Sequence, residues 1–181
     1  FMWNHHEHLE TYIGAPAGGL VTHTMNLRLH PDDNTYIASH AGDRVLVVDK
    51  VLWPLAEQFA ERVGFEHVIA AGAGERPEGA LDFEELLASA DEAAFAYRDL
   101  DERLAAAMCF TSGTTGKPKG VVYSHRAIAI HALTSVSLLA LNEGDTVLPV
   151  VPMFHANAWC YPFSCTLVGA KQVFPGPHLD P

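Results

Sequence analysis

Residues 110–120 read Phe110-Thr111-Ser112-Gly113-Thr114-Thr115-Gly116-Lys117-Pro118-Lys119-Gly120. The stretch holds four hydroxyl side chains, three glycines and two lysines. Glycine lets a backbone adopt positive φ angles and approach a ligand closely, and successive backbone N–H groups form a nest that binds anions. Together with the hydroxyl donors and the lysine charges, this composition predicts a loop that cradles a polyphosphate.

The loop is not a Walker A motif. That motif places four residues between its first glycine and its Gly-Lys-[Ser/Thr] end. Here only Thr114 and Thr115 separate Gly113 from Gly116, and Pro118 follows Lys117. Polyphosphate binding therefore has to rest on a different loop geometry.

Short strands are expected on both sides of the loop. Residues 106–110 precede it, and residues 121–123 follow it as a second apolar run. Ser124 is a good N-cap for a helix that continues to about Leu139. Because ligands of α/β sheets bind beyond the carboxyl ends of strands, the loop lies where such a ligand is expected.

Strands and helices alternate over the rest of the chain, which predicts an α/β layered sheet with flanking helices. Gly64 is expected to end the first helix of this series, and residues 90–104 are expected to be only partly helical. The expected strands are 44–49, 67–70, 146–151 and 171–174, and the expected helices are 52–63, 82–88 and 156–167.

Composition narrows the function classes. The chain has 181 residues, 49% of them hydrophobic, with a mean hydropathy of +0.08, enough for one domain or a large subdomain. A formal net charge of -11 argues against a nucleic-acid binder, which needs a basic face. Apolar runs long enough to span a membrane are missing, so no transmembrane segment is expected. Three cysteines without CxxC spacing predict a reducing, cytoplasmic location: Cys109, Cys160 and Cys165.

The string from Phe110 to Val121 resembles the phosphate-binding motif of the adenylate-forming superfamily, which includes acyl-CoA synthetases, firefly-type luciferases and adenylation domains of peptide synthetases. It matches the family pattern without a departure. A second match is Val151-Pro152-Met153-Phe154-His155, which resembles the aromatic-His motif beside the acyl site of that family.

Finer features resemble the medium- and long-chain fatty-acyl-CoA synthetases. They are Leu9-Glu10-Thr11-Tyr12, His23 to Leu29, Tyr36-Ile37, His40-Ala41, and the extension of the second motif to Trp159. The resemblance implies a partial N-terminal AMP-binding domain over residues 1–181, with the phosphate loop at 110–121 and the aromatic-His motif at 151–159.

The resemblance implies a two-step ligase reaction. A fatty-acid carboxylate attacks the α-phosphate of ATP, and the thiol of coenzyme A then takes the acyl group. Lys119 and His155 would be catalytic, Asn157 and Trp159 would line the acyl pocket with His155, and Thr111 or Thr114 would touch Mg²⁺. The β- and γ-phosphates would be held by Thr111, Ser112, Gly113, Thr114, Thr115, Gly116 and Lys119.

The family's Tyr-Gly-x-Thr-Glu motif, ribose-binding Asp, downstream Arg and C-terminal catalytic Lys are not in this sequence. We therefore expect a piece of a longer protein, without the C-terminal domain and with weak or no activity alone. Homodimers occur in this branch, so the resemblance leaves a homodimer open for the full-length protein, while the sequence does not decide the oligomeric state. Two alternatives stay open, namely a non-catalytic nucleotide-binding or relic module and an aryl or short-chain acid–CoA ligase.

Two other groups of residues were considered as a metal site and as a nucleophile with its base, and the sequence favours neither. The histidines of Asn4-His5-His6-Glu7-His8 lack HExxH spacing, so we expect a polar helix surface with a structural role for His8. Ser124 and His125 lack a G-x-S-x-G elbow, which favours a helix cap over a nucleophile and base. The cysteines are expected to be core thiols.

Overall fold

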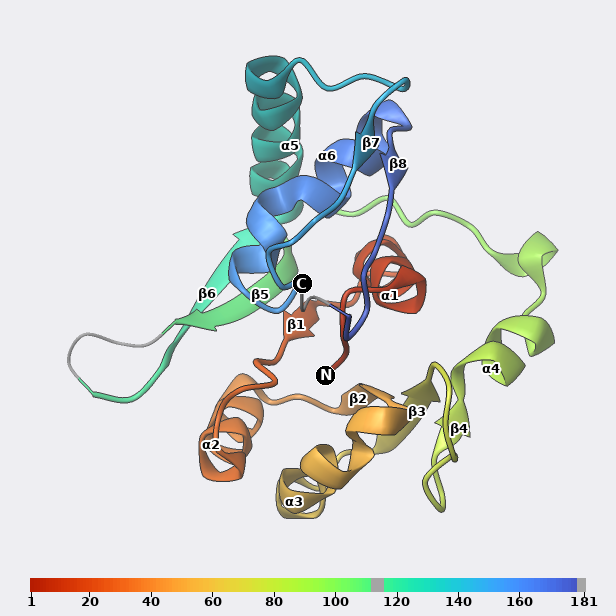
Figure 1. Cartoon of the computed structure of the whole chain (residues 1–181), viewed down its shortest axis with the longest axis vertical. Coiled ribbons are helices and arrows are strands. Elements are labelled where there is room, and N and C mark those ends of the chain that lie inside the picture. Colours follow the sequence, from red (N-terminus) through yellow and green to blue (C-terminus); the bar gives the residue numbers. More distant parts are fainter. Residues whose placement is uncertain (112–115, 179–181) are drawn as a thin grey trace. The chain divides into compact units, whose positions relative to one another are not determined.

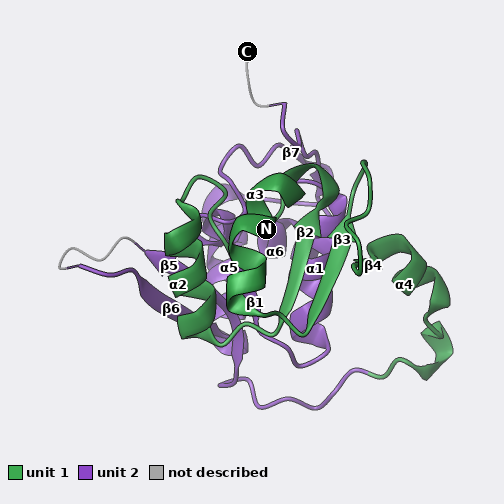
Figure 2. Ribbon diagram, turned by 90° about the horizontal axis from the view of Figure 1, so that it is seen from below, with its two compact units in different colours: residues 1–2, 25–96 green, residues 3–24, 97–181 purple. Residues whose placement is uncertain are grey.

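The computed structural model of the chain describes residues 1–111 and 116–178. It divides into two compact units (Figure 2). Unit 1 contains residues 1–2 and 25–96, and unit 2 contains residues 3–24 and 97–181. Among the described residues, none of the helices is both long and apolar enough to cross a membrane.

Unit 1 is built around a small parallel sheet, β2-β3-β4 (Figure 1). Its elements follow the order α2 (Pro31–Ala41), β2 (Val45–Asp49), η1 (Lys50–Leu52), α3 (Trp53–Val63), β3 (His67–Ala71), β4 (Leu81–Asp82), α4 (Phe83–Ser89) and η2 (Glu92–Ala94).

The β2–α3–β3 segment follows its sequence pattern closely. β2 and β3 pair in parallel from Val45 opposite His67 to Asp49 opposite Ala71. α3 lies between them in the chain and buries Ala56, Phe59 and Ala60, which recur at helical spacing. Gly64 ends α3 with a φ of 73°, a conformation that glycine adopts without a steric penalty. The predicted strands and helix of this segment are confirmed.

Local side-chain bonds fix α4. The Asp82 carboxylate accepts hydrogen bonds from the backbone N–H groups of Glu84 and Glu85 and lies 2.8 Å from the Lys50 ammonium. The hydrogen bond from Lys50 and those from the backbone lower the pKa of Asp82. The helix predicted over 82–88 is therefore confirmed, with Asp82 as its N-cap. In the stretch 90–104, the one helical turn is η2.

Unit 2 contains a mixed sheet, β1-β5-β6, and a short parallel pair, β7-β8 (Figure 1). Its elements are α1 (His6–Ala17), β1 (Thr22–Thr24), β5 (Ala105–Thr111), β6 (Lys119–Ser124), α5 (His125–Leu139), β7 (Thr146–Val147), η3 (Ala156–Cys160), α6 (Tyr161–Val168) and β8 (Lys171–Gln172).

The sheet of unit 2 confirms the strands expected around the loop. β1 runs parallel to β5, and β6 returns antiparallel to β5 as a hairpin. The Ser124 hydroxyl accepts a hydrogen bond from the Ala127 N–H at 3.2 Å, so Ser124 is the predicted N-cap of α5. β1 and α2 were not among the elements expected from the sequence, and α1 extends well beyond the polar helix surface expected at residues 4–8.

Three predicted elements of unit 2 are shorter than expected. The strands predicted over 146–151 and 171–174 pair over two residues each, as β7 and β8. Pro149 and Pro175 lack the N–H that a longer ladder needs. The helix predicted over 156–167 is right-handed only in α6, because residues 156–160 turn with the opposite hand.

Candidate functional site

The β5–β6 hairpin carries the loop predicted to bind phosphate. In its register Phe110 lies opposite Gly120, and Thr111 lies opposite Lys119 at the last pair before the loop. Thr111 and Lys119 are exposed, and Gly116 has a φ of 134°, which L side chains rarely adopt. The predicted phosphate ligands Ser112, Gly113, Thr114 and Thr115 lie outside the described residues.

The carboxyl ends of β1 and β5 meet at one edge of the sheet, because the two strands are parallel with Thr24 opposite Cys109. Thr111 follows two residues later on β5. The Thr24 hydroxyl lies 3.3 Å from both the Phe154 carbonyl oxygen and Asn157 Oδ1, and it shares its proton between these acceptors. The second motif is thus held at the sheet edge where β5 enters the phosphate loop.

Residues 148–160, called here the aromatic-His segment, contain the second motif. Within it, His155 and Trp159 are exposed, the latter with 58% of its surface accessible, whereas Asn157 is buried and bonded to Thr24. The three predicted acyl-pocket residues therefore differ in environment: two face outward, and Asn157 makes an internal contact.

A left-handed turn explains this division. The five residues of η3, Ala156 to Cys160, all have positive φ, between 44° and 68°. Such a conformation costs about 1–2 kcal/mol for each L-residue other than glycine. The turn is therefore maintained by tertiary contacts, since the sequence contains no glycine there.

Side chains from the start of the chain supply contacts to this segment. Buried Asn4 bonds to the backbone at positions 149, 151 and 153, and the buried Tyr12 hydroxyl donates to the Met153 carbonyl. Tyr12 and Met153 also form a buried cluster with Ala158. The sequence assigned no role at this segment to Asn4, Tyr12 or Thr24, because a local sequence pattern does not indicate partners more than 100 residues away.

The histidines near the start of the chain have structural contacts. His5 caps α1 by accepting a hydrogen bond from the His8 N–H at 3.3 Å. His8 is buried, and its Nδ1 lies 2.9 Å from the Trp3 carbonyl oxygen. Burial lowers the pKa of His8 to about 3, so its imidazole is neutral at physiological pH. The structural role expected for His8 fits these contacts.

The three cysteines are buried. Burial raises the pKa of Cys160 to about 11 and raises that of Cys109 and Cys165 as well. A thiol with a raised pKa forms little of the nucleophilic thiolate, so these side chains behave as core residues.

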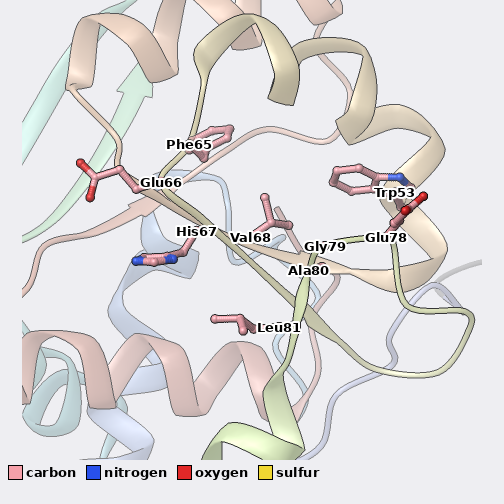
Figure 3. A pocket seen from close by; sticks show the side chains of 9 residues that line it. All are labelled: Trp53, Phe65, Glu66, His67, Val68, Glu78, Gly79, Ala80 and Leu81. Atoms are coloured by element: carbon pink, nitrogen blue, oxygen red, sulfur yellow. The ribbon is translucent and has the colours of Figure 1, made fainter.

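A separate cavity of about 250 Å³ lies in unit 1 (Figure 3). It opens beside β3, the start of α3 and the segment leading into β4. Of the residues predicted to bind phosphate or the acyl group, none that the structure describes lines this cavity. The lining residues are Trp53, Phe65, Glu66, His67, Val68, Glu78, Gly79, Ala80 and Leu81.

A sequence profile of the AMP-binding enzyme family matches residues 1–181. The chain belongs to this family. It is 51% identical to a long-chain-fatty-acid–CoA ligase of Thermus thermophilus over 99% of its own length and 33% of that relative's. It is 43% identical to a 3-methylmercaptopropionyl-CoA ligase of Ruegeria pomeroyi over 98% of the chain and 34% of that relative.

Solved structures give the same fold. The anthranilate–CoA ligase AuaEII in complex with anthranoyl-AMP superposes with a TM-score of 0.83 at 26% identity, over 97% of this chain and 34% of that one. The α/β fold of the N-terminal part of an AMP-binding enzyme is therefore confirmed. The chain spans about a third of the length of the curated relatives it matches.

Proposed function

We propose that this chain is the phosphate-binding part of an AMP-forming fatty-acid–CoA ligase. In the first step a carboxylate oxygen bonds to the α-phosphorus of ATP, and pyrophosphate leaves. In the second step the thiol of coenzyme A attacks the acyl carbon, a thioester forms, and AMP leaves. The identity of 51% to a long-chain-fatty-acid–CoA ligase supports a fatty acid as substrate.

The observation that carries the proposal is the shared sheet edge. Thr111 leaves β5 at the edge where Thr24 holds Phe154 and Asn157. Displacement at phosphorus depends mainly on positioning and on neutralising the charge of the departing pyrophosphate. An edge that carries both a phosphate loop and an acyl motif supports that arrangement.

The described loop residues suit a polyphosphate. Exposed Lys119, at the last hairpin pair, would add a point charge to the β- and γ-phosphates. Gly116 would let the backbone approach them. The remaining contacts are proposed for Thr111, Ser112, Gly113, Thr114 and Thr115.

The acyl side is proposed for the aromatic-His segment. Exposed His155 would orient the carboxylate toward the α-phosphate, and exposed Trp159 would contact the acyl chain. Asn157 is proposed to border the acyl pocket from its buried position, where it bonds to Thr24 at the end of β1.

The donor set fits Mg²⁺. Hydroxyl and phosphate oxygens are the hard ligands that this ion prefers, and Thr111 is an exposed residue at the end of β5. Thr111 or Thr114 would hold the ion or one of its waters. Mg²⁺ bound with ATP would supply charge neutralisation at the phosphates.

The test is carboxylate-dependent exchange of labelled pyrophosphate into ATP by the full-length protein. We expect exchange with fatty acids and a fall of about 100-fold in Lys119→Ala, because the substitution removes a positive charge that would neutralise the leaving pyrophosphate. Thr115→Ala should also slow exchange. The control is Lys171→Ala, which removes an exposed lysine on β8. Unchanged exchange in both loop variants would overturn the loop assignment.

A second candidate is a short-chain or aryl acid–CoA ligase. It is favoured by the 43% identity to a 3-methylmercaptopropionyl-CoA ligase. The same exchange assay with acids from 2 to 18 carbons and with benzoate distinguishes the two. A maximum above about eight carbons supports the fatty-acid proposal, and a maximum at short or aromatic acids supports the second.

We further propose a cytoplasmic location and a homodimer for the full-length protein. The three unpaired, buried cysteines support a reducing compartment. Light scattering of the purified full-length protein tests the dimer.

A further inference from the structure

Residues 148–155 of the aromatic-His segment belong to no helix or strand. Their buried backbone groups therefore lack the partners that a regular ladder supplies. An unpaired buried N–H or C=O destabilises a fold by an amount comparable to a lost hydrogen bond, so such groups nearly always find a side chain or water. His155 N–H bonds locally to the Pro152 carbonyl oxygen, and side chains from the first 24 residues of the chain supply further partners.

Asn4 is the most connected of these partners. Its Nδ2 donates to the carbonyl oxygens of Pro149 and Val151, each at 3.0 Å, and its Oδ1 accepts from the Met153 N–H at 2.8 Å. Its backbone carbonyl accepts from the Gly176 N–H at 2.9 Å, which fixes the residue itself. One side chain of 4% exposure thus holds three positions of an irregular segment.

Tyr12 and Thr24 continue the same pattern along the segment. The Tyr12 hydroxyl donates to the Met153 carbonyl, and its ring is fully buried against Phe163. Thr24 bonds to the Phe154 carbonyl and to Asn157. The bonds from Asn4, Tyr12 and Thr24 end on residues on both sides of His155.

We infer that Asn4, Tyr12 and Thr24 are positioning residues that fix the backbone carrying His155 and Trp159 for the adenylation step. The inference rests on the proposed function. None of the three needs to touch substrate, since each acts through the backbone or through Asn157. Thr24 reaches the left-handed turn through Asn157, and Tyr12 reaches it by packing with Ala158, whereas Asn4 holds the backbone that precedes the turn. A displacement of about 1 Å at a reacting group can slow a reaction roughly 100-fold.

The experiment uses the full-length protein and three hydroxyl variants. Thr24→Val and Tyr12→Phe remove one hydroxyl each and keep the shape of the side chain, and Thr24→Ser restores the hydroxyl. The matched control is Thr11→Val on the same helix as Tyr12, because the Thr11 hydroxyl donates to the Glu7 carbonyl oxygen within α1, at 2.9 Å. Deuterium exchange is followed in peptides covering 148–160 and, as internal reference, 105–111.

We expect deuterium exchange at 148–160 to accelerate about tenfold in Thr24→Val and Tyr12→Phe. Deuterium exchange at 105–111 and the thermal midpoint should stay near the values of Thr11→Val. Carboxylate-dependent pyrophosphate exchange should show a kcat about tenfold lower and a raised KM for the carboxylate, with the KM for MgATP unchanged. Thr24→Ser should recover both readouts to within about threefold.

Unchanged deuterium exchange at 148–160 would overturn the inference, and so would accelerated exchange accompanied by kinetics equal to those of Thr11→Val. A lowered kcat with both KM values changed to the same extent, together with a lowered thermal midpoint, would also overturn the inference, because general destabilisation has this effect. The proposed function fails separately, if the unsubstituted protein shows no carboxylate-dependent exchange. In that case the deuterium-exchange measurement still tests whether these side chains stabilise residues 148–160.

Discussion

The β5–β6 hairpin and the aromatic-His segment both carry motif residues, but their backbones are held in different ways. In the hairpin, β5 pairs with β6, its neighbour along the chain, from Ala105 opposite Ser124 to Thr111 opposite Lys119. The segment 148–160 is held by side chains at positions 4, 12 and 24, between 130 and 149 residues away in sequence. A regular ladder satisfies its own polar groups, whereas an irregular segment depends on distant side chains.

The largest effect is expected for Asn4→Ala. Three hydrogen bonds to the segment are lost, each contributing roughly 1 kcal/mol, so the free energy of unfolding should fall by about 3 kcal/mol. Chemical denaturation of the full-length protein measures it. Asn142→Ala is the control, because the exposed Asn142 side chain bonds only within its own turn, to the Ala140 carbonyl, Asp145 and the Gly144 N–H. Equal losses in both variants would contradict the special dependence on Asn4.

Acidification should lower the free energy of unfolding through His8, a buried residue of α1. His8 is neutral in the folded protein because burial lowers its pKa to about 3, whereas it titrates near 6.5 when unfolded. Its contribution is thus complete above the unfolded pKa and is lost as pH falls toward the folded one. Between pH 7 and pH 5 the free energy of unfolding should fall by about 2 kcal/mol from this residue alone.

The check is the difference between the unsubstituted protein and His8→Asn, measured by denaturation at both pH values. His30→Asn serves as the control, because the His30 side chain is 70% exposed. A pH dependence that survives unchanged in His8→Asn would rule out His8 as its source.

In the hairpin, Gly120→Ala tests a packing contact of the ladder itself. A Cβ at this position would lie 3.2 Å from the ring of Phe110, its cross-strand partner. The ring has to shift, and the expected loss is about 1.5 kcal/mol by thermal unfolding. In a Phe110→Ala background the penalty should disappear; its persistence would show that the clash is with something other than the ring.

The smallest effect is expected for Ser124→Ala, which removes the cap between β6 and α5. The loss should be about 1 kcal/mol, and Ser124→Gly should lose only a few tenths. Thermal unfolding of the two variants checks the order. Neither variant should change deuterium exchange at 148–160, and a change there would show that the hairpin and the segment are coupled.

Sequence patterns predicted correctly those elements whose information is local. Ser124 caps α5, Gly64 ends α3, and the strands around residues 110–120 lie where their apolar runs predicted, because a cap, a positive φ or a two-residue period needs no distant partner. The string from Phe110 to Val121 likewise indicated the family that the comparisons confirmed.

The conformation of residues 156–160 depends on long-range packing. Their composition predicted a right-handed helix, yet they form a left-handed turn that buries Asn157 and exposes Trp159. The same holds for Asn4, Tyr12 and Thr24, whose importance lies in which distant backbone groups they meet. Periodicity describes a residue's neighbours along the chain, and hydrogen-bond partners more than 100 residues away are set by the packing of the whole unit.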